Sequence, residues 1–155
     1  MKKWFAGAIV YWYENGVLKF LLLRSRSTNP LHDWQGEQVK FPGGSNRDHP
    51  EETNPLETCR RELYEETGLR LKPGVSPESS TPEQVAEDYY KIFFYINIKD
   101  CEGRMRQEAD YPEGFPDGDD RLSAPFWVLE GETDIVYKTH QPALQEAPQH
   151  IHLVG

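Results

Sequence analysis

The sequence predicts a single domain of the mixed α+β class, in which strands dominate and one helix follows the third strand. Three observations support this prediction. The chain has 155 residues, of which 37% are hydrophobic and 12% aromatic, enough for one core of ordinary size. Its apolar segments are mostly short β-rich runs separated by Gly, Pro and Asn. No internal repeat or long linker divides the chain.

The first half begins with strands. Two β-rich runs, at 4–13 and 17–24, flank Glu14-Asn15-Gly16, and Asn-Gly is typical of a hairpin turn. A short strand is expected at 38–41, before a break at Pro42-Gly43-Gly44.

A helix is expected next, over 54–67, because Gly68 follows it where a left-handed cap is favoured. The run Tyr89–Ile98 is the strongest strand signal in the chain. We further expect strands at 69–71 and 124–129, a terminal helix at 141–147, and loops at 73–87 and 100–124.

The formal net charge is −9, and most of the acidic excess lies in 51–66, 76–88 and 100–120. Repulsion between like charges argues against unaided binding to nucleic acid or an anionic membrane, and favours cations as partners. No stretch approaches the roughly 20 apolar residues of a membrane span. Cys59 and Cys101 form no CxxC pair, so neither a disulfide scaffold nor a thiolate zinc site is expected. A cytoplasmic protein is the expectation.

Three carboxylates converge on the expected helix. Glu62, Glu65 and Glu66 are three or four residues apart and share one strip beside the apolar face. Like charges at this spacing repel, and a divalent cation would turn the repulsion into ligation. The alternative is a solvated acidic face on which Arg61 pairs with Glu57 or Glu65.

The residues around this strip carry a resemblance. Arg61 to Leu69 reads RELYEETGL and follows Pro42-Gly43-Gly44. This arrangement closely resembles the signature of the Nudix hydrolases, a loop–helix–loop with the core REUxEExGU, where U is aliphatic. The resemblance implies a Nudix-type α/β/α sandwich with a mixed β-sheet, in one domain over 1–155.

One part of the pattern departs from the family. The position eight residues before Arg61, where the family has a glutamate, holds Thr53, and Gly44 lies three residues too far upstream. A three-residue insertion in 45–53 explains the spacing. Glu52 or Glu51 would then supply the displaced carboxylate, which in the family mainly braces the loop against the arginine.

The resemblance also implies a reaction, the hydrolysis of a nucleoside diphosphate linked to another moiety. Glu62, Glu65 and Glu66 would hold Mg²⁺ or Mn²⁺, with the carbonyl of Gly44 in the coordination shell, and Arg61 would brace the loop. The general base is left open between Glu62 and a carboxylate from a later loop, because the family differs internally on this point.

That later loop is 100–120. Its candidates for a further ligand or base are Glu108, Asp110, Asp117, Asp119 and Asp120. Asp119 and Asp120 lie just before the strand that contains Phe126-Trp127, where family members often contribute a ligand, and of the two we assign Asp120 to the metal. The alternative for each is a solvated acidic loop.

Substrate contacts are expected from two places. Arg24 and Arg26 alternate on one face at the end of the second strand and could bind phosphate; a solvated strand end is the alternative. Trp34 could stack on a base, although such aromatics more often belong to the core.

Several identities are open at this stage. The substrate could be a dinucleoside polyphosphate, a nucleotide sugar or a (d)NTP, or the chain could be a Nudix-fold module that binds a nucleotide without cleaving it. Three crowded carboxylates argue against the last. Many relatives are dimers, so a homodimer is compatible with the resemblance.

Overall fold

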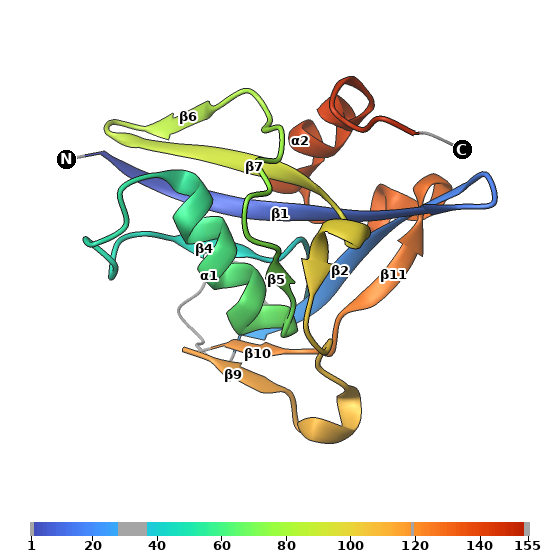
Figure 1. The fold of residues 1–155 in the computed structure, drawn as a ribbon. Helices are drawn as coiled ribbons and strands as arrows, with labels where there is room; N and C mark the ends of the chain where they lie inside the picture. The colour runs from blue at the N-terminus through green and yellow to red at the C-terminus, as the bar shows by residue number, and fades with distance from the viewer. Residues whose placement is uncertain (1, 28–36, 119, 154–155) are drawn as a thin grey trace.

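The computed structural model describes residues 2–27, 37–118 and 120–153, and Figure 1 shows a mixed sheet with one helix on each side. In these residues the main sheet has nine strands. Six follow the order β6 (Glu83–Ala86), β7 (Tyr89–Asn97), β1 (Lys3–Glu14), β2 (Val17–Ser27), β10 (Asp120–Leu122) and β9 (Phe115–Asp117). β11 (Phe126–Leu129) and β3 (Glu37–Lys40) also pair with β2, and β4 (Gly43–Ser45) pairs with β1.

The hairpin β1–β2 is the centre of this sheet. Asn15 and Gly16 have φ angles of 53° and 77°, which confirms the expected turn. β1 also pairs in parallel with β7 along nine residue pairs. β2 extends beyond the part that pairs with β1, and its second half pairs with β3 and β10. These three strands form the side of the sheet that carries the candidate site.

Alternation along β1 builds two cores, one for each layer. Ile9 and Tyr11 belong to a cluster that includes residues of α2 (Gln141–Glu146). Ala8 and Val10 point the other way, into a cluster with residues of α1 (Pro55–Thr67). The period of two in a strand therefore gives the α/β/α arrangement seen in Figure 1.

Helix α1 begins and ends at local signals. The side chain of Asn54 accepts a hydrogen bond from the backbone N–H of Glu57, and Pro55 occupies the first turn. At the other end Gly68 has a φ of 87°. A Cβ at this glycine would collide with the carbonyl oxygen of Arg104, so both conformation and space require glycine. The expected helix is thus confirmed to within one residue.

The expected loops contain more regular structure than the sequence indicated. The segment 73–87 includes β6, and 100–124 includes β8 (Cys101–Glu102), β9 and β10. The break at Pro42-Gly43-Gly44 runs directly into β4, and β5 (Arg70–Leu71) pairs with β8. These strands are short and polar, and pairing with distant partners forms them. The 3₁₀ segments are η1 (Ile98–Asp100), η2 (Glu108–Asp110), η3 (Glu130–Ile135), η4 (Lys138–His140) and η5 (Ala147–Gln149).

Two further findings concern membrane-spanning segments and the cysteines. Within the described ranges, no helix has the length and apolar character needed to cross a membrane. Cys59 and Cys101 are both free thiols, and Cys59 lies on the buried face of α1, where burial raises the pKa of its thiol.

Candidate active site

The three glutamates of α1 lie on one strip, as predicted, but in unequal environments. Glu66 is 1% exposed and Glu62 is 8% exposed, whereas the side chain of Glu65 is 47% exposed. Two of the three carboxylates are therefore held inside the protein, where an unpaired charge is unfavourable.

The glycine loop lies directly against the buried pair. The backbone N–H of Gly43 donates to Glu66 Oε1 at 2.8 Å. A Cβ at Gly44 would collide with the carboxylate of Glu62, so a glycine is required for this close approach. β4 and the last two turns of α1 are thereby locked together around these two side chains.

Arg61 joins the loop 45–53 to the helix α1. Its guanidinium contacts Glu52 at 2.8 Å, Glu62 at 2.8 Å and Glu65 at 3.3 Å. It also donates to the carbonyl oxygen of Ser45 at 3.1 Å. The planar fork of an arginine suits such multiple acceptors, so this residue fixes the loop relative to the strip.

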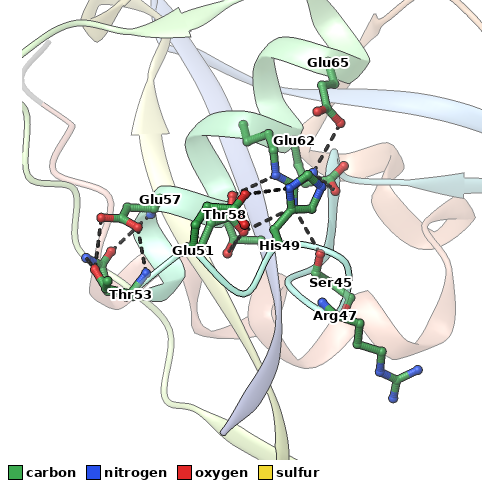
Figure 2. A network of polar contacts seen from close by, with 12 residues as sticks. Ser45, Arg47, His49, Glu51, Thr53, Glu57, Thr58, Glu62 and Glu65 are labelled. Carbon is green, nitrogen blue, oxygen red and sulfur yellow. Dashed lines mark hydrogen bonds and ion pairs between the residues drawn. The ribbon is translucent and has the colours of Figure 1, made fainter. Parts of the chain in front are cut away.

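The displaced family glutamate is replaced by Glu52. Its Oε1 accepts from Thr58 Oγ1 at 2.7 Å while its Oε2 pairs with Arg61. Thr53, at the family's usual position, instead donates from its backbone N–H to Glu57 at 2.8 Å near the start of α1. Glu51 is exposed and contacts His49 (Figure 2). Of the two carboxylates the sequence offered, Glu52 takes the bracing position.

Burial perturbs both inner carboxyl groups. It raises the pKa of Glu66 to about 8, even though the ammonium of Lys40 and the N–H of Gly43 lower it. Burial likewise raises the pKa of Glu62, against the lowering effect of Arg61. A pair of desolvated carboxyls that share a site is typical of a functional centre.

The chemistry of the donor atoms at this site suits a divalent cation, although the described side chains do not converge on one point. In the part of the chain that the structure describes, no three His, Cys, Asp or Glu side chains are gathered closely enough to ligate a metal. Arg61 and Lys40 contact the carboxylates instead. Glu66 Oε2 is nevertheless buried without a hydrogen-bond partner among these residues, and hard carboxylate oxygens are the ligands that Mg²⁺ and Mn²⁺ prefer.

The acidic residues of the later loop are dispersed. Asp117 and Asp120 are paired across β9 and β10, and both raise the pKa of Lys40 by their charge. Asp110 accepts from the backbone N–H of Gln107 and pairs with Arg104, which are structural contacts. Glu108, the fourth described candidate, accepts from the backbone N–H of Ala124 at 3.2 Å. Asp119 lies outside the described residues.

Arg24 and Arg26 lie on the α2 side of β2, the face opposite to the acidic strip. Arg24 pairs with Val39, which packs against the core on the α2 side, and Arg26 lies opposite Arg121. The three arginines line a cavity of about 730 Å³, together with Glu37, Glu108 and Glu113. The predicted stacking residue Trp34 lies outside the described residues.

Two residues of this region were not anticipated from the sequence. Lys40 on β3 reaches the carboxylate of Glu66, with Nζ and Oε2 3.6 Å apart. Arg106 donates to the carbonyl oxygens of Glu66 and Ser123 at 2.6 and 2.9 Å, and so ties the end of α1 to the strand region of β10. The sequence places Lys40 three residues before Gly43, but a lysine in a short strand is usually solvated, so this position alone does not mark it as part of the site.

The acidic strip of α1, joined by Arg61 to the glycine loop, is the arrangement that the resemblance to the Nudix hydrolases implies. A model of the NUDIX domain matches residues 3–143, so the chain belongs to the Nudix family. It is accordingly a hydrolase that acts on phosphoric anhydride bonds.

Solved structures support the fold. A structure of MutT, from work on Aliivibrio salmonicida and Vibrio cholerae, has a TM-score of 0.62 at 12% identity, over 97% of this chain and all of its own. The NUDIX domain of Shewanella oneidensis NrtR, complexed with ADP ribose, has a TM-score of 0.55 at 16% identity, covering 96% and 88%. An Ap4A hydrolase of C. elegans has a TM-score of 0.52 at 16% identity, covering 94% and 95%.

Proposed function

We propose that this chain is a Mg²⁺- or Mn²⁺-dependent hydrolase that cleaves the diphosphate bond of a nucleoside diphosphate linked to another moiety. The observation that supports this most strongly is Glu66, a fully buried carboxyl held by the N–H of Gly43 and beside Glu62. A protein that only needed stability would gain nothing from two desolvated carboxyls in one place.

We assign the binding of the cation and the activation of water to different residues of the chain. Glu62, Glu65 and Glu66 would hold the cation, with the Gly44 carbonyl and Asp120 as further ligands. When bound, the cation neutralises the diphosphate and lowers the pKa of a bound water. The attacking water needs a carboxylate as base, for which Glu62 and the carboxylates of 100–120 are the candidates.

Arg61 acts in this scheme as a positioning residue. Its contacts to Glu52 and to the Ser45 carbonyl hold the loop while it holds Glu62. Loss of Arg61 would displace the ligands without removing any of them.

Arg24 and Arg26 are proposed to bind the anionic part of the substrate that lies away from the cleaved bond. Arg26 lies between Glu37 on β3 and Arg121 on β10, and the like charge of Arg121 repels it. No ion pair joins any of the three guanidiniums to a carboxylate of the described residues. An anion in the 730 Å³ cavity would relieve the repulsion. Trp34 stays a proposed base-stacking residue.

A substrate screen tests the proposal. The purified protein is incubated with Mg²⁺ and a panel that covers nucleotide sugars, dinucleoside polyphosphates, (d)NTPs and ADP ribose, and the phosphate-containing products are quantified. Hydrolysis that EDTA abolishes and that Glu66→Gln lowers by orders of magnitude supports the proposal. No hydrolysis of any compound, together with thermal protection by one of them, favours a nucleotide-binding module instead.

We also propose that the protein forms a homodimer, which is tested by measuring its mass in solution. Light scattering at several protein concentrations gives the mass of the particle in solution, to be compared with the 18.0 kDa chain.

A further inference from the structure

The substrate's diphosphate needs hydrogen-bond donors as well as a metal, and β3 presents them on the α1 side of the sheet. Lys40 pairs with Leu23 in the β2–β3 register, whereas Arg24 pairs with Val39. Neighbours along a strand point to opposite faces. Arg24 and Arg26 are thus turned away from Glu66, whereas Lys40 lies on the same side of the sheet as the acidic strip.

The ammonium of Lys40 is enclosed but poorly satisfied. Its side chain is 15% exposed, and its nearest carboxylate oxygen, on Glu66, is 3.6 Å away, beyond hydrogen-bond distance. No described residue accepts a hydrogen bond from Nζ, although an ammonium has three donors to place. Nearby carboxylates, that of Glu66 foremost, raise the pKa of Lys40 against the effect of burial, so the ammonium lacks hydrogen-bond acceptors and not opposite charge.

Two further hydrogen-bond donors beside Lys40 also lack an acceptor among the described residues. Gln38 lies two residues earlier on the same face, and Ser25 is its cross-strand partner on β2. The Nε2 of Gln38 and the Oγ of Ser25 are buried without a partner among the described residues. Three donors from two adjacent strands are therefore unused, and they lie on the side of the sheet that faces the carboxylates of α1.

We infer that Lys40, with Gln38 beside it, binds a non-bridging oxygen of the substrate's diphosphate. A phosphate group has several oxygens that accept, which is the complement of a row of unused donors. A cation held by Glu62 and Glu66 would displace the ammonium from its present contact toward that oxygen by charge repulsion. This inference rests on the proposed function, because it places the diphosphate at the acidic strip.

The experiment measures ligand binding rather than turnover. The probe is methylenediphosphonate, a diphosphate analogue whose P–C–P bridge is not hydrolysed, titrated calorimetrically into the protein at saturating Mn²⁺. Mn²⁺ binding alone is measured in parallel by the electron paramagnetic resonance of the free ion. The variants are Lys40→Met, Lys40→Arg and Gln38→Leu, with Lys19→Met as a control that changes the net charge equally at a site near Trp12.

The expected result is specific to the probe. Lys40→Met weakens methylenediphosphonate binding by about 10-fold or more, and Gln38→Leu weakens it by about 3-fold. Lys40→Arg retains binding within about 3-fold, and Lys19→Met does not change it. Lys40→Met binds Mn²⁺ at least as tightly as the wild type, because a competing positive charge has been removed.

Two outcomes overturn the inference. Unchanged binding of the probe to Lys40→Met means that the lysine does not contact phosphate. Loss of Mn²⁺ binding in the same variant means that the lysine serves only to arrange Glu66. Should Lys40→Met fail to fold, unchanged binding to Gln38→Leu overturns it equally. A wild-type protein that hydrolyses no compound refutes the proposed function instead, and the probe titration then tells whether the phosphate site exists without catalysis.

Discussion

Replacing Glu66 by Gln should stabilise the metal-free protein at high pH and leave it unchanged at low pH. Glutamine keeps an oxygen to accept the N–H of Gly43 but cannot ionise. The wild-type carboxyl has a pKa raised from 4.5 to about 8, mainly by burial. Because the folded-state pKa lies above the unfolded one, the native state binds the proton more tightly, and stability falls as pH rises between these values.

The size of the effect follows from this shift. A change from 4.5 to about 8 corresponds to about 5 kcal/mol lost by pH 9, and to none below pH 4.5. The variant does not recover all of it, since the buried ammonium of Lys40 loses the carboxylate that stabilises it most. A net gain of roughly 3 kcal/mol at pH 9 is expected, which raises the melting temperature of a chain this size by roughly 10 °C.

The assay is thermal unfolding in EDTA at pH 5 and pH 9, with Glu65→Gln as the matched control. Glu65 is on the same helix but has a half-exposed side chain, so its substitution should shift both melting temperatures by similar small amounts. Comparing variant with wild type at each pH cancels the other titrating groups. Equal melting temperatures of wild type and Glu66→Gln at pH 9 would refute the idea of a buried charge at this position.

Three further substitutions test the remaining parts of the site. Glu52→Gln should lower the free energy of unfolding by about 2 kcal/mol, because the partly buried guanidinium of Arg61 loses a charged partner. The exposed Glu51→Gln should leave it unchanged, and urea denaturation measures both. Gly44→Ala should lower kcat by at least about 10-fold, since its methyl group would displace the Glu62 carboxylate; a kcat equal to the wild type's contradicts this close approach. Asp120→Asn should lower turnover and weaken Mn²⁺ binding, and if neither changes, this residue is not a ligand.

Local signals account for what the sequence predicted well. Asn54, Pro55 and Gly68 mark the ends of α1 by hydrogen bonding and φ preference alone, so no distant partner was needed to locate the helix. The acidic strip follows from the 3.6-residue period of that helix. The family resemblance added the chemistry, and the match to the NUDIX domain confirmed the family.

What escaped prediction depends on contacts between distant residues. β9 and β10 are only three residues long each, and Gly, Pro and Asp residues lie in or beside them. They form because β10 pairs with the second half of β2 and β9 pairs with β10. The register of β2 also decides which face each arginine takes, and the sequence of a strand does not reveal which face carries the site. Lys40 escaped for the same reason, since a lysine in a short strand is usually solvated.

The residue that takes the place of the family glutamate could be predicted from the sequence only in part. The sequence narrowed the choice to two neighbouring carboxylates, but the conformation of an inserted loop was needed to separate them. The guanidinium of Arg61 selects the carboxylate that reaches it, 2.8 Å from Oε2 of Glu52.

The most direct test of the account is the metal dependence of hydrolysis with the acidic strip intact and altered. Product release from nucleoside diphosphate derivatives is measured with Mg²⁺, with EDTA, and with Mg²⁺ restored, for the wild type and for Glu66→Gln. The account predicts turnover that disappears with EDTA, returns with Mg²⁺, and falls by orders of magnitude in the variant. Turnover that survives EDTA, or that is equal in the two proteins, would contradict it.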